Sequence, residues 1–319
     1  MRRWKVFCND DLSLKKDALK ELELISDVSY YPAIKDVLLE NIHHYDAYYA
    51  SAHVQTSREV LEIARNLRVI ATPSTGTDHI DIKYAKEKNI DVIQLTKEID
   101  LLNEFTATAE HAWGLLLACI RKLPAAFDCA KNGYWARQRF TGFQLYKKTL
   151  GIIGLGRLGT MMASFGNGFN MNVIGYDIVK KNINGVNQVS LDELLKSSDV
   201  ISLHIHFTDD NRGFISNELF KKMKRSVVLI NTSRGGIIDE DALLENLYSG
   251  HVSAAGLDVI NGEWDKNLYD HPLIEYSRKY DNLVISPHIA GATVESIVGA
   301  RVFLAKKLAD YIKQKENIS

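Results

Sequence analysis

The chain has 319 residues, of which 46% are hydrophobic and 25% are charged. This composition is typical of a globular protein of about two domains and excludes a disordered, coiled-coil or collagen-like chain. The 39 Lys and Arg residues balance the 40 Asp and Glu residues, so charge favours neither a nucleic acid nor a membrane as a partner. No run of about 18 apolar residues predicts a membrane span, and the first residues do not resemble a signal peptide. The three scattered cysteines are typical of a reducing compartment, which favours the cytoplasm.

The first third of the chain alternates short apolar runs with helical patterns. Thr56 and Glu59 have the spacing of a capping box, which predicts the start of a helix. The apolar runs on either side of this helix and beyond it predict strands at Lys5–Cys8, Tyr45–Ala50, Leu67–Pro73 and Asp91–Leu95.

The same alternation is stronger in the middle of the chain. Ser190 and Glu193 form a second capping box, and another helix is expected between Asp239 and Gly250. Near-continuous apolar strands separated by helices form parallel sheets that are covered on both faces. The sequence therefore predicts an α/β fold with two doubly wound parallel-sheet domains. The strands predicted here are Thr149–Gly154, Asn172–Asp177, Val200–His204, Val227–Thr232, Ala254–Val259 and Leu283–Ser286.

Two long helical patterns, at about 104–130 and 293–314, are not followed by a strand of their own domain. We interpret them as the segments that carry the chain from one domain to the other, so that the C-terminal helix completes the first domain. This interpretation predicts one domain from residues 1–103 and 293–319, and a second from residues 104–292.

A glycine-rich turn follows the first strand of the middle region. Gly154, Gly156 and Gly159 form a G-x-G-x-x-G pattern that leads into a helix. In this context the first glycine permits a tight turn, the second lets the backbone approach a pyrophosphate, and the third lets the helix pack on the strand. The turn therefore predicts a dinucleotide site, and a glycine-rich turn without a ligand is the alternative.

An acidic residue ends the next strand. Asp177 lies 18 residues beyond the last glycine of the turn, close to the usual spacing of about 20. Its carboxylate would accept hydrogen bonds from a ribose hydroxyl and repel a 2′-phosphate, which favours NAD over NADP. Lys180 and Lys181 lie nearby and weaken this preference.

Three predicted strand ends are followed by Arg234, Glu263 and His288. Ligands of open parallel sheets bind at this edge. An arginine binds a carboxylate through two hydrogen bonds, a histidine exchanges a proton near neutral pH, and a neighbouring carboxylate orients its ring. Beside a nicotinamide, the three predict hydride transfer at a carbon next to a carboxylate, with His288 protonating the carbonyl oxygen. Taken singly, they could be a surface arginine, a solvated loop acid and a turn histidine.

Other candidates have simpler interpretations. His204 and His206 could form a metal pair, but no third ligand follows at a suitable spacing, so no metal site is predicted. Cys119 lies in an apolar helical run, which favours a buried inert thiol. We interpret Trp135 as packing at the domain junction, and His111 as a hinge or packing residue.

These residues lie in motifs by which the chain resembles the D-2-hydroxyacid dehydrogenases, a family that includes phosphoglycerate dehydrogenase. The resemblance extends over nearly the whole chain. Its landmarks are STGTDHID at 74–81, TAEH at 108–111, TLGIIGLGRLG at 149–159, NTSRGG at 231–236, GLDV at 256–259 and SPHIAG at 286–291.

The resemblance implies a Rossmann nucleotide domain inserted into a flavodoxin-like substrate domain, NAD as the cofactor, and a homodimer paired through the nucleotide domains. It implies that Arg234 binds the substrate, a small 2-hydroxy or 2-keto acid, and that His288 is the acid/base with Glu263 as its partner. The backbone amides of Thr75 and Gly76 would hold the substrate carboxylate. The cofactor contacts implied by the resemblance are Gly154, Gly156, Arg157, Leu158, Gly159, Asp177, Thr108, His204, Thr232 and Asp258.

The chain departs from the family pattern in places that bear on the substrate and the cofactor. The segment at 51–53 (SAH) stands where many phosphoglycerate-type members carry arginines, which argues against phosphoglycerate as the substrate. His206 replaces a usual proline that borders the adenosine side, and Lys147 replaces a glycine in a turn. Because the sequence ends after its last predicted helix, we expect it to lack the regulatory domain of longer phosphoglycerate dehydrogenases.

Two alternatives to a hydroxyacid dehydrogenase stay open. One is a non-enzymatic NAD-sensing protein of the corepressor type, against which the intact set of Arg234, Glu263 and His288 argues. The other is oxidation of formate or phosphite. Formate dehydrogenases of this family pair the histidine with glutamine, so Glu263 counts against that activity.

Overall fold

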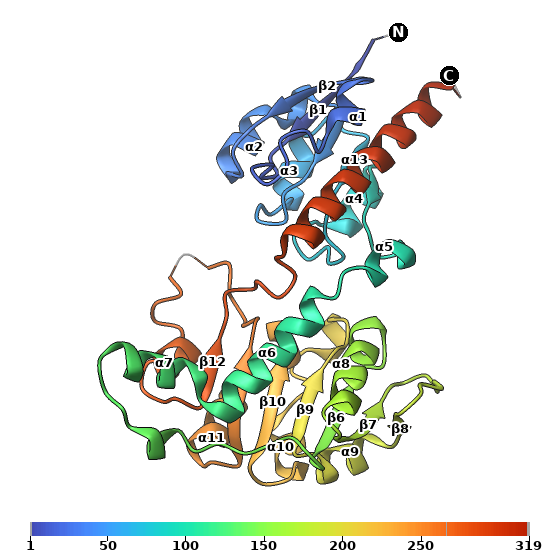
Figure 1. The fold of residues 1–319 in the computed structure, drawn as a ribbon. Coiled ribbons are helices and arrows are strands. Elements are labelled where there is room, and N and C mark those ends of the chain that lie inside the picture. The colour runs from blue at the N-terminus through green and yellow to red at the C-terminus, as the bar shows by residue number, and fades with distance from the viewer. Residues whose placement is uncertain (1, 266, 318–319) are drawn as a thin grey trace. The chain divides into compact units, whose positions relative to one another are not determined.

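The computed structural model describes residues 2–265 and 267–317. The chain divides into two compact units, Met1–Phe105 with Ala292–Ser319, and Thr106–Gly291 (Figure 1). These limits lie within one or two residues of the predicted boundaries. The second unit is thus inserted between the two segments of the first.

The first unit is built on a five-stranded sheet with helices on both faces. Its strands are β1 (Trp4–Cys8), β2 (Ser26–Tyr30), β3 (Ala47–Tyr49), β4 (Val69–Ala71) and β5 (Asp91–Ile93). Its helices are α1 (Lys20–Glu23), α2 (Lys35–Asn41), the 3-10 helix η1 (Ile42–His44), α3 (Arg58–Ile63), α4 (Ile82–Glu87), α5 (Ile99–Asn103) and α13 (Val294–Asn317).

The sheet of the first unit has the order β2-β1-β3-β4-β5, and all its neighbouring strands are parallel. This is the flavodoxin-like order. The C-terminal helix α13 lies against this sheet (Figure 1), where Leu304, Leu308 and Ile312 are buried in one cluster with Val6 and Tyr49. The last helix therefore completes the first unit, as the long helical pattern predicts.

The second unit is built on a seven-stranded sheet. Its strands are β6 (Thr149–Ile153), β7 (Asn172–Tyr176), β8 (Asn187–Gln188), β9 (Val200–Leu203), β10 (Val227–Asn231), β11 (Val252–Leu257) and β12 (Leu283–Ile285). Its helices are α6 (Ala107–Arg121), α7 (Leu123–Lys131), α8 (Arg157–Gly168), α9 (Leu191–Ser197), α10 (Asn217–Lys222), α11 (Glu240–Tyr248) and α12 (Pro272–Ser277), with the 3-10 helices η2 (Arg137–Phe140), η3 (Asp209–Asn211) and η4 (Gly235–Ile237).

The sheet of the second unit has the order β12-β11-β10-β9-β6-β7-β8, with all pairs parallel. The strand order runs outward in both directions from β6, as in a Rossmann fold, so a ligand crevice is expected where β6 meets β9. Every residue of β10 is buried, because helices cover both faces. Because neighbouring strands are parallel, the carboxyl ends of these strands lie along one edge of the sheet: those of β6, β7, β9, β10, β11 and β12.

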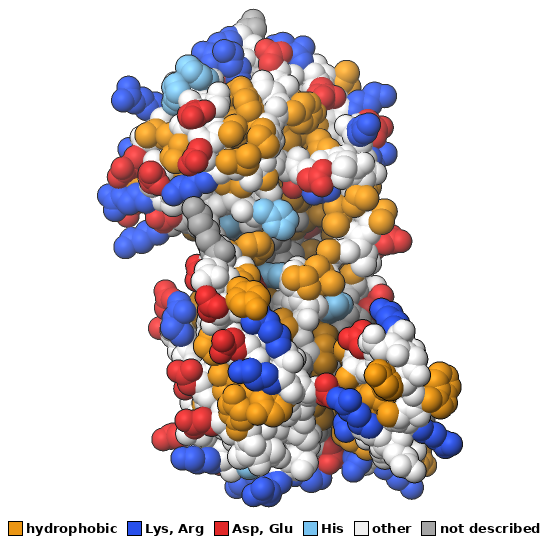
Figure 2. Space-filling view, turned by 90° about the vertical axis from the view of Figure 1, so that its left-hand side faces the viewer, with side chains coloured by type: hydrophobic (Ala, Val, Ile, Leu, Met, Phe, Trp, Pro, Cys, Tyr) orange, Lys and Arg blue, Asp and Glu red, His pale blue; other side chains and the backbone are white. Residues whose placement is uncertain are grey.

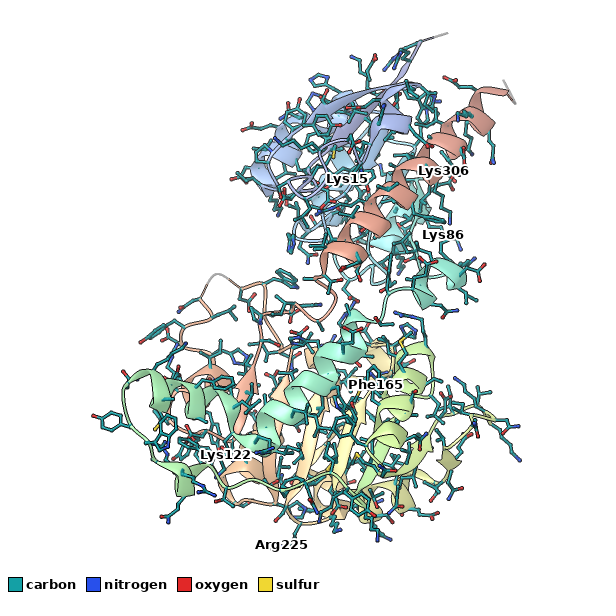
Figure 3. All side chains as sticks on the ribbon, in the orientation of Figure 1. Lys15, Lys86, Lys122, Phe165, Arg225 and Lys306 are labelled. Atoms are coloured by element: carbon teal, nitrogen blue, oxygen red, sulfur yellow. The ribbon has the colours of Figure 1, made fainter. Side chains whose placement is uncertain are left out.

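Helix α6 covers one face of this sheet, where Leu116 and Cys119 pack in a cluster with Leu150 and Ile230. Trp113 of α6 lies 5.9 Å, ring to ring, from Phe165 of α8, which is labelled in Figure 3. Burial raises the pKa of the Cys119 thiol to about 12, as expected for an inert thiol. Truncating a fully buried leucine such as Leu116 typically costs about 2–5 kcal/mol of stability.

The predicted helix at 104–130 is wrong as a single element. Lys122 adopts a left-handed conformation (φ +52°) and separates α6 from α7, at the junction labelled in Figure 3. Pro124 near the start of α7 explains the break, because proline has no N–H to donate to the carbonyl of Ile120 and its ring would clash with that carbonyl in a continuous helix. The capping box at Thr56 is also wrong: Ser57 occupies the N-cap position of α3 without a side-chain capping bond, and Thr56 forms a bridge with Ile80. At Ser190 the predicted cap is present, since its hydroxyl accepts from Glu193 N.

Basic and acidic side chains are interspersed over the face shown in Figure 2. This mixture agrees with the balanced charge of the sequence. Within the described ranges, no helix combines the length and the apolar character that crossing a membrane requires.

Candidate active site

The turn between β6 and α8 has the geometry that the glycine pattern predicts. Gly154 has φ +95°, and a Cβ there would lie 2.3 Å from the carbonyl oxygen of His204. A Cβ on Gly159 would lie 2.0 Å from the carbonyl oxygen of Gly154. At Gly156, by contrast, no heavy atom of the described residues beyond its chain neighbours lies within 4 Å of the Cβ position. The turn is therefore closed on the protein side and open at Gly156, where the N-terminus of α8 offers N–H groups to an anion.

Asp177 at the end of β7 is tied to this turn. Its Oδ2 accepts from Leu155 N at 2.8 Å, and its Oδ1 accepts from Val179 N at 3.0 Å. Lys181 Nζ lies 3.0 Å from Oδ2 and also donates to Leu155 O. Burial alone would raise the pKa of this carboxyl, but the hydrogen bonds from Val179, Lys181 and Leu155 outweigh burial and lower it. Asp177 is thus ionised, and the ammonium group of Lys181 lies beside it.

Two buried polar atoms lie at the ends of neighbouring strands β9 and β10. His204 Nδ1 and Thr232 Oγ1 have no hydrogen-bond partner within the described chain. The other ring nitrogen of His204 pairs with Ser202 Oγ at 2.8 Å, and burial lowers the pKa of His204 to about 4. Buried polar atoms are rarely left unpaired, so these two fit a polar ligand at this edge. Together with the turn, they fit the predicted dinucleotide.

Asp258, which follows β11, organises the loop that carries His288. The Asp258 side chain accepts from Ser286 Oγ (2.6 Å), Ile289 N (3.0 Å) and Ala290 N (2.8 Å), and its backbone oxygen accepts from His288 N (2.8 Å). It is 1% exposed. Burial alone would raise the pKa of Asp258, but the hydrogen bonds outweigh it and lower the pKa. The loop after β12 is therefore held by a buried carboxylate.

His111 of α6 extends this network. Its Nε2 lies 2.8 Å from Ser286 Oγ and 3.4 Å from Asp258 Oδ1. Because the Ser286 hydroxyl donates its single proton to Asp258, it accepts from His111. Neither Ser286 nor the pairing of His111 follows from sequence reasoning, although both residues lie inside the motifs that carry the family resemblance.

Glu263 and His288 form the pair that the sequence predicts. His288 Nδ1 lies 2.6 Å from Glu263 Oε1, and the Glu263 side chain is 16% exposed against 33% for His288. Trp264 lies against the imidazole, with ring centroids 5.8 Å apart. Since Nδ1 pairs with the carboxylate, Nε2 is the ring nitrogen left for chemistry.

Arg234 follows β10 and lies on the loop next to that of Glu263. Its Nη1 donates to Ser233 O at 2.7 Å, and its backbone oxygen accepts from Asn231 Nδ2 at 2.9 Å. A Cβ on the following residue, Gly235, would lie 2.4 Å from Asn261 N. The Arg234 loop thus packs directly on the loop that carries Glu263.

The first unit presents its own set of residues at the carboxyl edge of its sheet. Gly76 N donates to Ser74 Oγ (3.2 Å), and Thr75 O accepts from Thr96 Oγ1 (2.9 Å), so the predicted substrate loop is hydrogen-bonded at both residues. Asp10 after β1 forms a two-point ion pair with Arg301 of α13, at 2.5 and 3.1 Å. Burial raises the pKa of Asp10 despite this partner.

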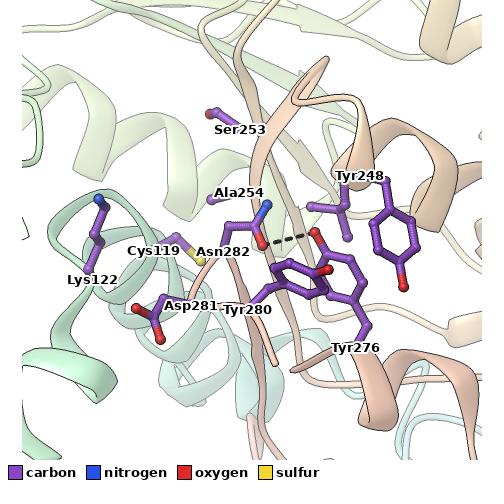
Figure 4. A pocket seen from close by; sticks show the side chains of 10 residues that line it. Cys119, Lys122, Tyr248, Ser253, Ala254, Tyr276, Tyr280, Asp281 and Asn282 are labelled. Atoms are coloured by element: carbon purple, nitrogen blue, oxygen red, sulfur yellow. Dashed lines mark hydrogen bonds between the residues drawn. The ribbon is translucent and has the colours of Figure 1, made fainter. Parts of the chain in front are cut away.

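A cavity of about 430 Å³ lies at the opposite end of the strands of the second unit. Tyr248, Tyr276 and Tyr280 line it, with Ser253 and Asn282 at the starts of β11 and β12 (Figure 4). Tyr276 OH donates to Asn282 Oδ1 at 3.1 Å, the contact drawn in Figure 4. Because Glu263 and His288 follow the carboxyl ends of the same strands, this cavity is distinct from the candidate site.

Known proteins resemble the chain over almost its full length. Residues 113–290 match the family described as D-isomer specific 2-hydroxyacid dehydrogenase, NAD binding domain. The chain is 37% identical over 316 residues to hydroxypyruvate reductase of Thermotoga maritima, an alignment that covers 97% of this chain and 98% of that protein. It is 36% identical over 306 residues to D-3-phosphoglycerate dehydrogenase of Methanocaldococcus jannaschii, covering 94% of this chain but 56% of that longer protein.

Solved structures also resemble the chain over almost its full length. D-lactate dehydrogenase of Aquifex aeolicus, in complex with NAD and lactic acid, superposes with a TM-score of 0.84 at 29% identity, covering 98% of this chain and 96% of that one. A glyoxylate reductase of Paecilomyes thermophila superposes with a TM-score of 0.85 at 27% identity, covering 99% and 97% of the two chains.

Proposed function

The chain belongs to the D-isomer-specific 2-hydroxyacid dehydrogenases, which are NAD-dependent oxidoreductases, and we propose that it reduces a small 2-keto acid, or oxidises the matching D-2-hydroxy acid, with Arg234, Glu263 and His288 as its catalytic residues. The observation that carries this proposal is the 2.6 Å contact between His288 Nδ1 and Glu263 Oε1, together with the packing of the loop before Glu263 on Gly235, the residue after Arg234.

His288 serves as the proton donor to the substrate oxygen. As a keto acid is reduced, negative charge develops on that oxygen, and an imidazolium can neutralise it by giving up the Nε2 proton. Glu263 fixes the ring through Nδ1 and stabilises its charged form. In the oxidative direction the neutral ring takes the proton back. Arg234 binds the substrate carboxylate and polarises the carbonyl, because its guanidinium keeps its charge at any working pH.

The residues around the glycine turn are those that would hold the cofactor. The open backbone at Gly156 and the N-terminus of α8 suit a pyrophosphate, and Asp177 suits a ribose hydroxyl. His204 Nδ1 and Thr232 Oγ1 are available to polar groups of the same ligand. When bound, the nicotinamide supplies or accepts the hydride. All the cofactor contacts, including those from Thr108, Arg157, Leu158 and Asp258, stay predictions.

The substrate that fits best carries a small, uncharged substituent. We propose that the amides of Thr75 and Gly76 bind its carboxylate. Asp10 neutralises Arg301 at the same edge of the first unit, so that arginine is not available to a phosphate group. The names hydroxypyruvate reductase and glyoxylate reductase among the relatives fit this class, but a relative of similar identity is named D-3-phosphoglycerate dehydrogenase, so the Asp10–Arg301 pair carries the choice against phosphorylated acids.

A spectrophotometric assay tests the proposal. NADH oxidation at 340 nm should proceed with glyoxylate, hydroxypyruvate or pyruvate and be much slower with phosphohydroxypyruvate. His288→Ala and Arg234→Ala should each lose most of the turnover while NADH still binds. Tight NADH binding with no turnover on any keto acid would instead favour the sensor alternative.

We also propose a homodimer paired through the second unit. Helix α7 has no buried residue, and the large side chains of Phe127, Tyr134 and Trp135 are 59%, 69% and 90% exposed. This exposure contradicts the interpretation of Trp135 as a packing residue. Exposed apolar groups of this size are typical of protein contact surfaces. Sedimentation should give a dimer that Trp135→Glu weakens, and a monomeric wild type would refute the pairing.

A cytoplasmic location is proposed from the thiols. Cys8 and Cys119 are buried, and all three cysteines are free. This pattern is typical of a reducing compartment.

A further inference from the structure

The short segment between β11 and Glu263 determines where the catalytic carboxylate lies. It turns at Gly262, which has φ +66°, and Ile260 N donates back to Glu263 Oε2 at 3.3 Å. Asp265 N donates to Gly262 O at 2.8 Å, closing the turn. A displacement of this segment would move Glu263 and, through the 2.6 Å contact, the ring of His288.

Two side chains hold the Asn261 backbone in this segment from both sides. Glu240 Oε1 accepts from Asn261 N at 2.7 Å, and His271 Nε2 lies 3.0 Å from Asn261 O. Glu240 and His271 are 16% and 15% exposed, and they lie 3.5 Å apart. Glu240 is the first residue of α11, whereas His271 caps α12. The segment is thus held by two helices that carry no residue of the proposed catalytic set.

The hydrogen bonds define the state of His271. Its Nδ1 accepts from Leu273 N at 3.3 Å, so Nε2 must carry the proton that it donates to Asn261 O. One neutral tautomer therefore satisfies both the cap of α12 and the Asn261 backbone.

The same peptide supports the arginine loop. A Cβ on Gly235 would lie 2.2 Å from Ile260 C and 2.4 Å from Asn261 N, so the backbone after Arg234 rests directly on the clamped peptide. The position of Asn261 consequently affects both the carboxylate that orients His288 and the loop that carries the substrate-binding arginine.

The surroundings of Glu240 make its charge sensitive to pH. Arg212, Asp239 and Asp241 line a cavity of about 360 Å³ with it. Burial is the main cause that raises the pKa of Glu240 to about 7; the hydrogen bonds from Asn261 oppose it, and the charges of Asp241 and Glu263 add to it. The carboxyl therefore changes charge near neutral pH.

We propose that Glu240 and His271 are positioning residues for the reaction: they hold both sides of the Asn261 peptide and thereby set the alignment of Glu263 with His288. This inference rests on the proposed function. It predicts that loss of either side chain lowers turnover while leaving cofactor binding in place, because neither lies at the glycine turn.

Kinetics of paired variants test this role. Glu240→Ala should lower kcat by about 10- to 100-fold, the usual cost of a small misplacement of a catalytic group, with KM and the NADH Kd changed less than about threefold. Glu240→Gln keeps an acceptor for Asn261 N, so it should recover most of kcat and flatten the pH dependence of kcat near 7. His271→Asn keeps a helix-capping side chain but is too short to reach Asn261 O, so it should resemble Glu240→Ala. The exposed Glu245→Gln on the same helix is the control and should match the wild type.

Two further measurements distinguish positioning from general damage. Adding Glu240→Ala to Glu263→Gln should cost clearly less than the product of the two separate losses, because Glu240 acts mainly through the carboxylate that Glu263→Gln has already altered; independent, multiplying losses would overturn the proposal. In histidine-labelled protein, the His288 Nδ1 proton of the short bond to Glu263 should give a downfield NMR signal that Glu240→Ala shifts or removes. This signal needs no substrate, so an unchanged signal refutes positioning, whereas a wild type inactive on every keto acid refutes only the proposed function.

Discussion

Replacing Asp258 by asparagine tests how the loop of His288 is built. The carboxylate accepts from Ser286 Oγ, Ile289 N and Ala290 N, at 1% exposure. An amide offers one oxygen in place of two, so its NH₂ group must face one of these donors. An unsatisfied buried donor costs about 1–3 kcal/mol, and the remaining hydrogen bonds lose their charge assistance. The free energy of unfolding of the variant should therefore be about 2–4 kcal/mol lower than that of the wild type.

The assay is urea unfolding of Asp258→Asn beside the exposed control Asp210→Asn, with kcat measured in parallel. Turnover should fall too, because the Asp258 side chain holds Ile289 N and Ala290 N, the two amides that follow His288. The folded pKa of Asp258 is lowered, so its contribution is present above the ordinary pKa of 3.8 and is lost as the pH falls through the lower folded value. The difference between variant and wild type should therefore shrink in acid. Equal stability and equal kcat at pH 7 would refute the reasoning.

Three other substitutions follow from the geometry. Glu263→Gln should lower kcat by about 30- to 160-fold, since removing the charge beside His288 costs about 2–3 kcal/mol in a partly exposed pair; a full-rate variant in the NADH assay would contradict the pairing. Asp177→Ala should raise the kcat/KM ratio of NADPH to NADH about tenfold, and Lys181→Met should lower it, because Lys181 lies 3.0 Å from Asp177 Oδ2; unchanged ratios would exclude a ribose role. Wild-type stability should fall relative to Glu240→Gln as the pH rises from 4.5 to about 7, by about 1–3 kcal/mol in chemical unfolding, because the folded pKa of Glu240 is raised; parallel pH curves would contradict a buried titrating carboxyl.

Buried strands are the elements that the sequence predicts best. The runs at 149–154 and 227–232 are mostly apolar because both faces of their sheet are covered, and they became β6 and β10. Strand β2 (Ser26–Tyr30) was not predicted, since it lies at a sheet edge and is only partly buried. The break at Lys122 was readable from Pro124, but the apolar pattern of α6 continues across it.

The candidate site also divides into residues that the sequence predicts and contacts that it does not. Spacing along the chain locates Arg234, Glu263 and His288 at strand ends, because every parallel strand ends at one edge. The hydrogen bond between His111 and Ser286 joins residues 175 positions apart, and Glu240 reaches Asn261 from another helix. Such contacts depend on how helices pack on the sheet, which no local pattern in one sequence specifies.

The backbone at His288 has a practical consequence. With φ +54°, this residue occupies a left-handed conformation that costs a typical side chain about 1–2 kcal/mol. Turnover and folding therefore favour different residues at this position: the chemistry needs an imidazole, whereas folding favours a residue that adopts the left-handed conformation with less strain. Asparagine is such a residue. A His288→Asn protein should consequently fold at least as well as the active enzyme, which makes it the natural choice for trapping a keto acid and NADH together in a crystal.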